Sequence, residues 1–420
     1  MTGGLTALIV HPSPDPGLLA SLRAECGQVL VLSPSARRRA HTERQEAITR
    51  YWYPVGIDPE TLARRVQAQH DVDAVVPTWE GTVETTAAIS QALGLPGNPP
   101  AAVCASRDKT VALDCWRRER VPHPRSALFE AANDGKEAIE SEFEYPFIVK
   151  IPRSTNSQSV TLVRSRADLA RGLTTIQQLY HSAATNRLSS LYSADAAKQP
   201  VLVQEYVEGL ELNIDLVYDV NDHRVLGVFE KYPMSGPAFA EVQSVYPVAL
   251  SSRQLSDAIA VAVAAVRALG VNTGAAHVEL RIASEGPVVI EAALRGGGFL
   301  TPDAVGRLTG LDPRAALFRL LATRVLPDLD PLPPHRACLY GAVNVATAGR
   351  VIRIIGADQA ARTPGTVLLE VLKKPGDQLV PLPAGTDYHV ARFLLDGSTR
   401  NEVETAARRI RESVVVELEA

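Results

Sequence analysis

Two carboxylates and an arginine are grouped within residues 277–298, HVELRIASEGPVVIEAALRGGG. Alternating apolar residues predict two antiparallel strands, 277–283 and 287–294, joined by a three-residue turn with a glycine in its left-handed position. The predicted pairs are Glu279 with Glu291, His277 with Ala293, Arg281 with Val289 and Ala283 with Pro287. Like charges directly opposite each other destabilise a sheet unless a cation lies between them. Because Mg²⁺ prefers oxygen ligands, Glu279 and Glu291 are predicted to bind it.

Other residues of this segment suit the same chemistry. Arg295 follows on the same face and can hold an anionic group beside the metal. The glycines at 296–298 let backbone approach a ligand closely, which makes Gly297 a candidate substrate contact. His277 is a candidate to hydrogen-bond a reacting acyl group, although a structural histidine fits the sequence equally well. The alternative for the whole segment is an exposed hairpin with charges at its rim.

Two lysines upstream are candidates for binding phosphate. Lys150 ends the apolar strand YPFIVKI, where a buried ammonium needs a partner and a phosphate would be one. Lys109 lies at or just before a predicted helix start in SRDKTVALDCW. Each is a weak indication alone, since lysines at strand ends commonly extend to solvent.

The segment VLVQEYVEGLELNIDL, residues 201–216, indicates a nucleotide-binding hinge. An apolar strand breaks at Glu205-Tyr206-Val207, turns at Gly209 and resumes at Glu211. Such a break frees backbone groups to hydrogen-bond an adenine edge, and the Glu211 carboxylate can accept from ribose hydroxyls. The alternative is a bulged strand without a ligand.

The elements that carry these residues belong to several predicted units. Residues 1–105 alternate continuous apolar strands with helical patterns, which predicts a doubly wound α/β domain. Its ligand crevice would lie near Thr78, Trp79, Glu80 and Glu84, past the carboxyl ends of the strands. The sequence contains neither GxGxxG nor GxxxxGK[ST], so neither a standard dinucleotide site nor a P-loop is expected.

From about residue 106 the pattern favours an antiparallel α+β architecture. We predict subdomains over 106–204 and 205–330, the second carrying the paired carboxylates. The proline-rich PDLDPLPPH at 327–335 reads as a linker to a β-rich module over 331–420.

Composition limits the classes of partner. Apolar residues form 46% and charged residues 21% of the 420-residue chain, so each unit can bury a core. A net charge of −4 argues against nucleic acid and anionic membranes as partners. The basic run Arg37–Arg39 is interpreted as a solvated loop. Four scattered cysteines and no apolar run of spanning length predict a cytoplasmic protein.

The order Lys109, Lys150, EYVEGLE, Glu279, Glu291, Arg295 resembles the ATP-grasp superfamily, in particular carboxylate–amine ligases such as L-amino acid ligases and carnosine-synthase-like enzymes. The GLPGN segment and the C-terminal stretch with KKPGDQL and DYHVARFLLDG are similar to the same ligases. The resemblance implies an ATP-grasp fold with an N-terminal pre-ATP-grasp domain and a C-terminal β-rich module. It also implies ATP and Mg²⁺, with Mn²⁺ as an alternative, and a homodimer as one assembly.

The resemblance assigns roles to individual residues. Lys109 and Lys150 would contact the phosphates, and Glu279 and Glu291 would hold one or two Mg²⁺. Arg295 would steady an acyl phosphate and a tetrahedral intermediate. The expected nucleotide contacts also include Ser157, Glu205, Tyr206, Val207 and Glu211.

Two features depart from the family pattern. The second metal motif commonly reads Glu-x-Asn-x-Arg, but Ala293 stands at the asparagine position, which leaves the number of Mg²⁺ ions open. The phosphate loop is usually rich in glycine, whereas PRSTNSQSV at 152–160 has none. Its hydroxyl and backbone groups can still contact phosphate, and a rigid loop is an equal alternative.

Substrate residues are expected in two places. The segment 230–247 resembles the acceptor-pocket segment of such ligases, and its candidates are Tyr232, Met234, Phe239 and Glu241. Glu80 and Glu84 are candidates to pair with a substrate ammonium, or simply to cap their helix. The predicted activity joins a carboxylate and an amine, at least one from an amino acid. The alternatives are an ATP-grasp carboxylase, a purine-pathway enzyme, or a non-catalytic ATP-binding protein.

Overall fold

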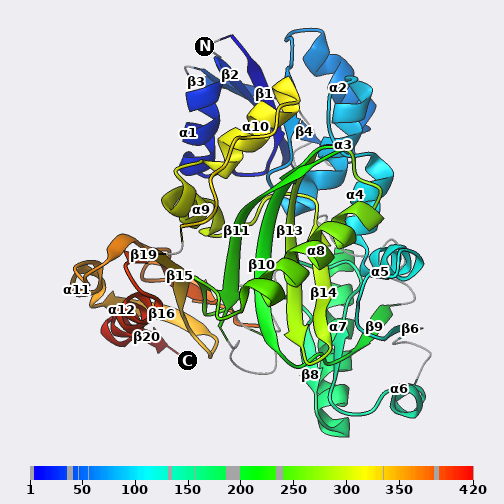
Figure 1. The fold of residues 1–420 in the computed structure, drawn as a ribbon, viewed down its shortest axis with the longest axis vertical. Helices are drawn as coiled ribbons and strands as arrows, with labels where there is room; N and C mark the ends of the chain where they lie inside the picture. Colours follow the sequence, from blue (N-terminus) through cyan, green and yellow to red (C-terminus); the bar gives the residue numbers. More distant parts are fainter. Residues whose placement is uncertain are drawn as a thin grey trace.

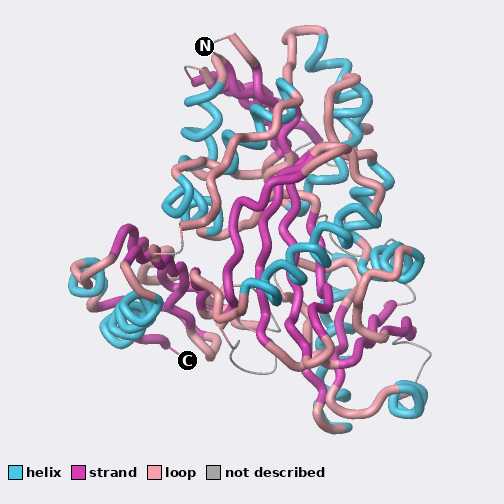
Figure 2. Tube along the Cα trace, in the orientation of Figure 1, coloured by secondary structure: helices cyan, strands magenta, loops and turns pink. Residues whose placement is uncertain are grey.

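A computed structural model of the 420-residue chain describes residues 4–35, 41–45, 47–54, 56–130, 135–155, 157–185, 199–232, 239, 241–333, 335–382 and 387–419. Met234 and Arg37–Arg39 lie outside these residues. Figures 1 and 2 show strands through the centre of the molecule, with helices packed outside them.

The N-terminal residues form a five-stranded sheet in the order β3-β4-β2-β1-β5. Strands β4, β2, β1 and β5 are parallel, and β3 is an antiparallel edge strand. This confirms the predicted doubly wound α/β architecture. The elements are β1 (Thr6–Val10), α1 (Pro16–Glu25), β2 (Gln28–Ser35), β3 (His41–Gln45), β4 (Ile48–Pro54), α2 (Pro59–Gln67), β5 (Ala74–Val76), the 3₁₀ turn η1 (Glu80–Thr82) and α3 (Val83–Ala92).

A four-stranded antiparallel sheet follows, in the order β6-β9-β7-β8. It is reached through two helices, and the second begins at Lys109 after the N-cap Asp108, as the sequence predicts. The elements are α4 (Pro100–Arg107), α5 (Lys109–Arg118), β6 (Ser126–Glu130), α6 (Lys136–Glu142), β7 (Phe147–Lys150), β8 (Thr161–Val163), α7 (Arg166–Thr185) and β9 (Pro200–Glu205).

An eight-stranded sheet forms the centre, in the order β14-β13-β10-β11-β12-β15-β19-β17. It continues across residue 330, because β15, β19 and β17 extend the sheet that begins at β10. Its elements and the helices among them are β10 (Leu210–Tyr218), β11 (His223–Lys231), β12 (Gln243–Tyr246), α8 (Ser252–Ala268), β13 (Gly274–Ala283), β14 (Gly286–Ala293), α9 (Thr301–Thr309), α10 (Pro313–Thr323), β15 (Ala337–Asn344), β17 (Thr366–Val371) and β19 (His389–Gly397).

The remaining C-terminal elements form a small three-stranded sheet, β18-β16-β20, with two helices. They are β16 (Gly349–Ile355), α11 (Ala357–Ala361), β18 (Gln378–Leu379), α12 (Arg400–Ser413) and β20 (Val415–Glu419). Figure 1 shows this module beside the central sheet and α10 beside α1 of the N-terminal sheet. The predicted domain boundaries at 105, 204 and 330 stay predictions.

The two faces of the central sheet differ in chemistry. Leu212, Ile214, Val278 and Leu280 alternate onto one face and pack in a core with α8 residues such as Ala262. The intervening residues of β10 and β13 are polar and face the other side: Glu211, Asn213, Asp215, His277, Glu279 and Arg281. Strand alternation thus places a charged surface on the back of an apolar core.

The predicted strand pairing of the hairpin is confirmed in the half with His277 and Glu279 and is wrong in the half next to the turn. Glu279 pairs with Glu291 and His277 with Ala293, as predicted. A bulge after Glu279 shifts the rest, so that Arg281 pairs with Val288 and Ala283 with Gly286 across a two-residue turn. The sequence gives no sign of the bulge, because the extra residue Ile290 continues the apolar run.

Candidate active site

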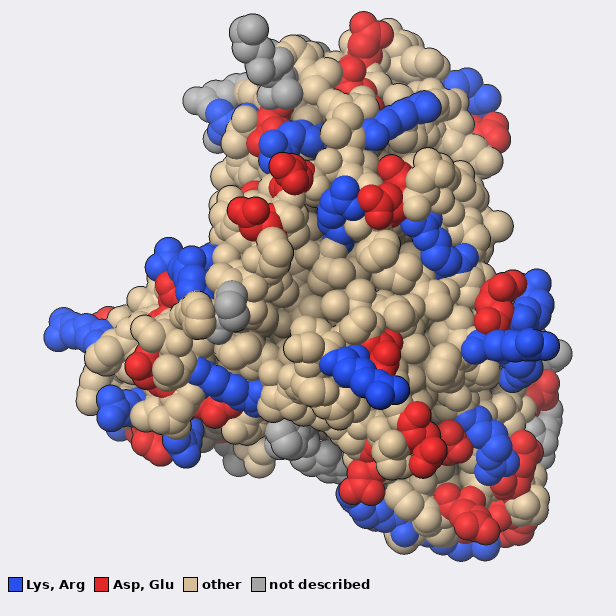
Figure 3. Space-filling model, viewed as in Figure 1, with Lys and Arg blue, Asp and Glu red and all other residues tan. Residues whose placement is uncertain are grey.

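A cleft between the four-stranded and eight-stranded sheets collects most of the predicted site residues. The cavity volume within it is about 380 Å³. The predicted residues that line it are Glu80, Lys109, Lys150, Ser157, Glu205, Tyr206, Val207, Glu211, Phe239, Glu241, His277, Glu279, Glu291 and Arg295. The cleft lies on the polar side of the sheet, opposite α8. On the α8 side, positive and negative side chains are interspersed around a largely uncharged centre (Figure 3).

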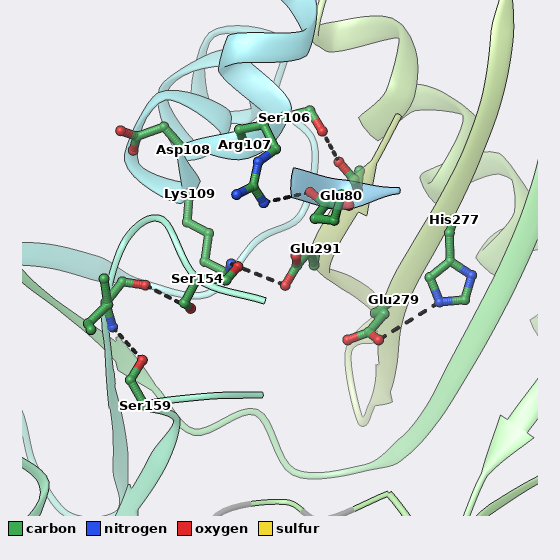
Figure 4. Close-up of polar contacts among 12 residues, drawn as sticks. Glu80, Ser106, Arg107, Asp108, Lys109, Ser154, Ser159, His277, Glu279 and Glu291 are labelled. Carbon is green, nitrogen blue, oxygen red and sulfur yellow. Dashed lines mark hydrogen bonds and ion pairs between the residues drawn. The ribbon is translucent and has the colours of Figure 1, made fainter. Parts of the chain in front are cut away.

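The two facing carboxylates each contact a lysine. Lys231 Nζ lies 2.8 Å from Glu279 Oε1. Lys109 Nζ lies 3.3 Å from Glu291 Oε2 (Figure 4). Burial would raise the pKa of Glu279, but Lys231 and His277 outweigh it and lower this pKa to about 2. Burial would likewise lower the pKa of Lys231, but Glu279 and Glu211 raise it well above its usual range. The hairpin therefore tolerates its like charges because lysines offset them.

The carboxylates fit a divalent metal ion. They present ionised oxygen donors on rigid, adjacent strands, and this donor set suits Mg²⁺ or Mn²⁺. Among the residues that the structure describes, no third His, Cys, Asp or Glu completes a metal-binding group. Phosphate oxygens and waters would therefore supply most of the remaining ligands.

Two further contacts hold the glycine-free loop near Lys109. Lys109 also donates to the carbonyl of Ser154, 3.3 Å away, in the glycine-free loop. The loop is anchored by Ser159, whose hydroxyl accepts from the Ile151 N–H at 3.0 Å. Lys150 is buried, and burial together with the nearby Lys109 lowers its pKa to about 8. Two adjacent ammonium groups favour an anion between them.

The predicted strand break is present between Glu205 and Leu210, and Arg281 contacts it. Arg281 donates to the carbonyl of Val207 at 2.8 Å and to Glu211 Oε2 at 2.9 and 3.0 Å. It lies over the Tyr206 ring, 5.0 Å from the centroid. The Val207 carbonyl oxygen therefore already accepts one hydrogen bond, from Arg281. Gly209 closes the turn at φ +140°, where a Cβ would lie 2.1 Å from the Ile282 carbonyl oxygen.

Glu80 is already neutralised by arginines, so its predicted pairing with a substrate ammonium is not supported. Arg107 lies 2.6 Å from one carboxylate oxygen, and Arg295 contacts the other. Burial would raise the pKa of Glu80, but Arg295 and Arg107 outweigh it and lower this pKa to about 2. Glu80 therefore fixes Arg295 at the edge of the cleft.

Three predicted substrate residues lie outside the cleft lining. Glu84 forms an ion pair with Arg153 at 2.6 Å. Tyr232 is exposed, and its N–H donates to the Gln243 carbonyl. The N–H of Gly297 donates to Asp215 Oδ1 at 2.7 Å, so this glycine serves packing against Asp215. A fourth candidate, Met234, lies outside the described residues.

His277 is held by an acid that sequence reasoning missed. Its Nδ1 lies 3.1 Å from Asp215 Oδ2, and its Nε2 lies 3.9 Å from Glu279 Oε1. Burial would lower the pKa of His277, but Asp215 and Glu279 outweigh it and raise the pKa. Nδ1 of the imidazole thus faces Asp215, and Nε2 faces Glu279.

Other cleft residues were also missed: Lys231, Arg281, Asn213, Phe299, Tyr388 and His389. The alternation of ELNID against HVELR contains a signal for Asn213 and Arg281, which share a face with Glu279 once strand pairing is known. Tyr388 directly precedes β19 and His389 is its first residue, and only the folded chain brings them to the cleft. Burial lowers the pKa of His389 to about 4.

Family models match two parts of the chain. The ATP-grasp domain matches residues 143–303, and L-amino acid ligase C-terminal domain 2 matches residues 343–419. These matches confirm the resemblance drawn from the order of motifs. No described helix has the length and apolar character needed to cross a bilayer.

Among curated proteins, carnosine synthase 1 of Mus musculus is 29% identical over 286 residues, which cover 65% of this chain and 33% of that protein. This chain thus spans about a third of the length of that relative.

Among solved structures, the L-amino acid ligase of Bacillus licheniformis superposes with a TM-score of 0.79 at 19% identity, covering 100% of both chains. A biotin carboxylase from Campylobacter jejuni superposes with a TM-score of 0.66 at 13% identity, over 98% of this chain and 92% of that one. These likenesses confirm the predicted ATP-grasp fold.

Proposed function

We propose that this protein, which carries an ATP-grasp domain followed by an L-amino acid ligase C-terminal domain, is an ATP-dependent carboxylate–amine ligase. It forms an amide or peptide bond through an acyl phosphate and releases ADP and phosphate. The proposal rests mainly on one arrangement: Glu279 and Glu291 face each other across two strands and meet Lys109, Lys150 and Arg295 in one cleft.

The reaction has two displacement steps. A substrate carboxylate oxygen attacks the γ-phosphorus of ATP, the bond to the ADP oxygen breaks, and an acyl phosphate forms. A neutral amine then attacks the acyl carbon, phosphate leaves, and the nitrogen loses a proton to give the amide. The chain contributes mainly position and charge, since phosphoryl transfer needs little covalent chemistry from protein groups.

The cleft residues divide these tasks. Lys109, Lys150 and the backbone around Ser157 bind phosphate oxygens, and Glu279 and Glu291 hold the divalent metal. When bound, Mg²⁺ supplies charge neutralisation of the transferring phosphoryl group. Arg295, fixed by Glu80, stabilises negative charge on the acyl phosphate and the tetrahedral intermediate.

The nucleotide base and ribose lie at the hinge. Glu205, Tyr206 and Val207 bind adenine through backbone groups and ring contact, and Glu211, oriented by Arg281, accepts from ribose hydroxyls. His277 lies beside Glu279, where it can hydrogen-bond the reacting acyl group.

The substrates are small molecules, at least one of them an amino acid. Glu241 lines the cleft and has no ion pair within the described residues, so it takes over the ammonium-binding role first assigned to Glu80 and Glu84. The protein is expected to be cytoplasmic and to bind neither nucleic acid nor membranes, and a homodimer is one assembly that the resemblance implies. The four predicted domains, at 1–105, 106–204, 205–330 and 331–420, share the binding of ATP, metal and substrates.

The test is phosphate release from MgATP across amino acids and small carboxylates, singly and in pairs, with Glu291→Gln as control. A ligase releases phosphate with one particular pair, and the variant loses this activity. Release that requires bicarbonate would instead indicate a carboxylase. ATP binding without release across the panel would contradict the ligase assignment and favour a non-catalytic ATP-binding protein.

A further inference from the structure

We propose that Asn213 supplies a third protein oxygen for the divalent metal ion, from a strand that the family's metal motifs do not include. This inference rests on the proposed MgATP-dependent function. It addresses the absence of an asparagine at position 293, where the chain has alanine.

Strand register places three oxygen-bearing side chains in one row. Asn213 on β10 pairs with Glu279 on β13, and Glu279 pairs with Glu291 on β14. Directly opposed residues share a face, and their Cβ atoms lie about 4.5–5.5 Å apart. All three residues line the cleft. The row therefore crosses three adjacent strands with an amide followed by two carboxylates.

The amide oxygen of Asn213 has no partner in the part of the chain that the structure describes. Asn213 is 2% exposed, and its Oδ1 is buried without a hydrogen bond. Buried polar atoms are nearly always satisfied, so an orphaned atom indicates an ion, water or ligand group. Because Oδ1 is an acceptor, neither a phosphate nor a carboxylate oxygen can satisfy it. A cation can.

The amide is oriented by residues on its other side. Nδ2 donates weakly to the Tyr340 hydroxyl at 3.4 Å, and the Thr301 hydroxyl donates to the same oxygen at 2.9 Å. Tyr340 does not line the cleft, so its contact turns the nitrogen branch of the amide away from the site. Oδ1 is left without a hydrogen bond, on a residue that pairs with Glu279.

The alanine side chain at position 293 has no oxygen to supply this ligand. Ala293 also lies in a different row of paired residues from Glu279. It pairs with His277, which in turn pairs with Asp215. Those two residues already satisfy each other through the imidazole Nδ1. An oxygen on β10 in the row of Glu279 is therefore the nearest replacement for the missing asparagine.

The test measures metal binding without turnover. Mn²⁺ is titrated into the full-length protein saturated with ADP, and free Mn²⁺ is followed by electron paramagnetic resonance. Asn213→Leu, which keeps the volume but removes the oxygen, should weaken Mn²⁺ binding roughly 10–100-fold. Asn213→Asp should bind Mn²⁺ at least as tightly as the unaltered chain.

Melting temperatures without metal separate this role from a structural one. Asn213→Leu should melt no lower than the unaltered chain, because it removes an unsatisfied acceptor. The matched control is Asn98→Ala, at another buried asparagine, which bonds Tyr218 and the Asn272 N–H outside the cleft. It should melt lower and bind Mn²⁺ normally.

The outcomes distinguish two failures. If Glu291→Gln loses Mn²⁺ affinity and Asn213→Leu keeps it, the role of Asn213 is wrong and the proposed function stands. If the unaltered chain binds no Mn²⁺ with ADP, both the metal row and the proposed function are overturned.

Discussion

Two pairs of glutamates are predicted to bind ligands, and the structure gives them different neighbours. Glu279 and Glu291 face each other on the central sheet, with side chains 27% and 30% exposed, and contact lysines. Glu80 and Glu84 lie in the N-terminal part of the chain and contact arginines. Lysine is a flexible point charge that a metal or phosphate can draw away, whereas arginine holds a carboxylate through fixed, directional hydrogen bonds. For these two pairs, the type of partner therefore separates carboxylates that a ligand can reach from carboxylates that are held in place.

The largest effect on activity is expected at the hairpin that carries Glu279 and Glu291. Glu291→Gln should lower ATP-dependent phosphate release by roughly 10²–10³-fold or more, the effect of losing one electrostatic contact to the transition state. Its thermal stability should change little, because Glu291 is partly exposed. Steady-state phosphate release and a melting curve measure the two quantities. Near-normal release from the variant would remove Glu291 from the metal site.

In contrast to Glu291, removal of the Glu80 carboxylate should have a large effect on stability. Glu80→Ala leaves the guanidinium of Arg107, a residue only 2% exposed, without its carboxylate. Removing one partner of a buried pair costs about 3–5 kcal/mol of unfolding free energy. Denaturant unfolding measures this cost.

Glu80→Gln keeps a hydrogen-bond acceptor and isolates the effect on Arg295. We expect a lower kcat with an almost unchanged KM for ATP, because Arg295 acts on charge that develops in the reaction. A rise in the KM of an amino-acid substrate with unchanged kcat would instead restore the original prediction that Glu80 binds ammonium.

Local pattern predicted the fold class and the pairing of Glu279 with Glu291. Continuous apolar strands identified the parallel N-terminal sheet, and alternation placed Glu279 opposite Glu291. The partners of these residues were not predictable, because they depend on long-range pairing. Lys231 reaches Glu279 from β11, two strands away in the sheet, and Arg107 reaches Glu80 from a different helix. The bulge at Ile290 was hidden because an apolar run looks the same in either register.

The lysines of the cleft provide a smaller, pH-dependent contrast. Below pH 8 Lys150 is mostly charged, and it loses its proton as the pH rises through its lowered pKa of about 8. ATP phosphates favour the charged form, so ATP binding at pH 8 should take up roughly half a proton and weaken at higher pH. Lys231 should contribute no such uptake, since its pKa is raised.

Calorimetry in buffers of different ionisation enthalpy measures the proton uptake. Lys150→Arg serves as control, because an arginine stays charged throughout this range. Equal uptake in the variant would assign the proton to another group.

The smallest effect is expected at Glu84, the partner of Arg153. Their side chains are 33% and 19% exposed, and a partly exposed ion pair contributes at most about 1 kcal/mol. Glu84→Gln should therefore leave phosphate release within a factor of two to three, and shift the unfolding free energy by less than about 1 kcal/mol. Arg153 belongs to the glycine-free loop, so the same variant also tests whether this ion pair holds the loop. If the KM for ATP rises while stability is unchanged, the Glu84–Arg153 pair acts on the nucleotide through the loop, and the second pair of glutamates then has one member in function and one in structure.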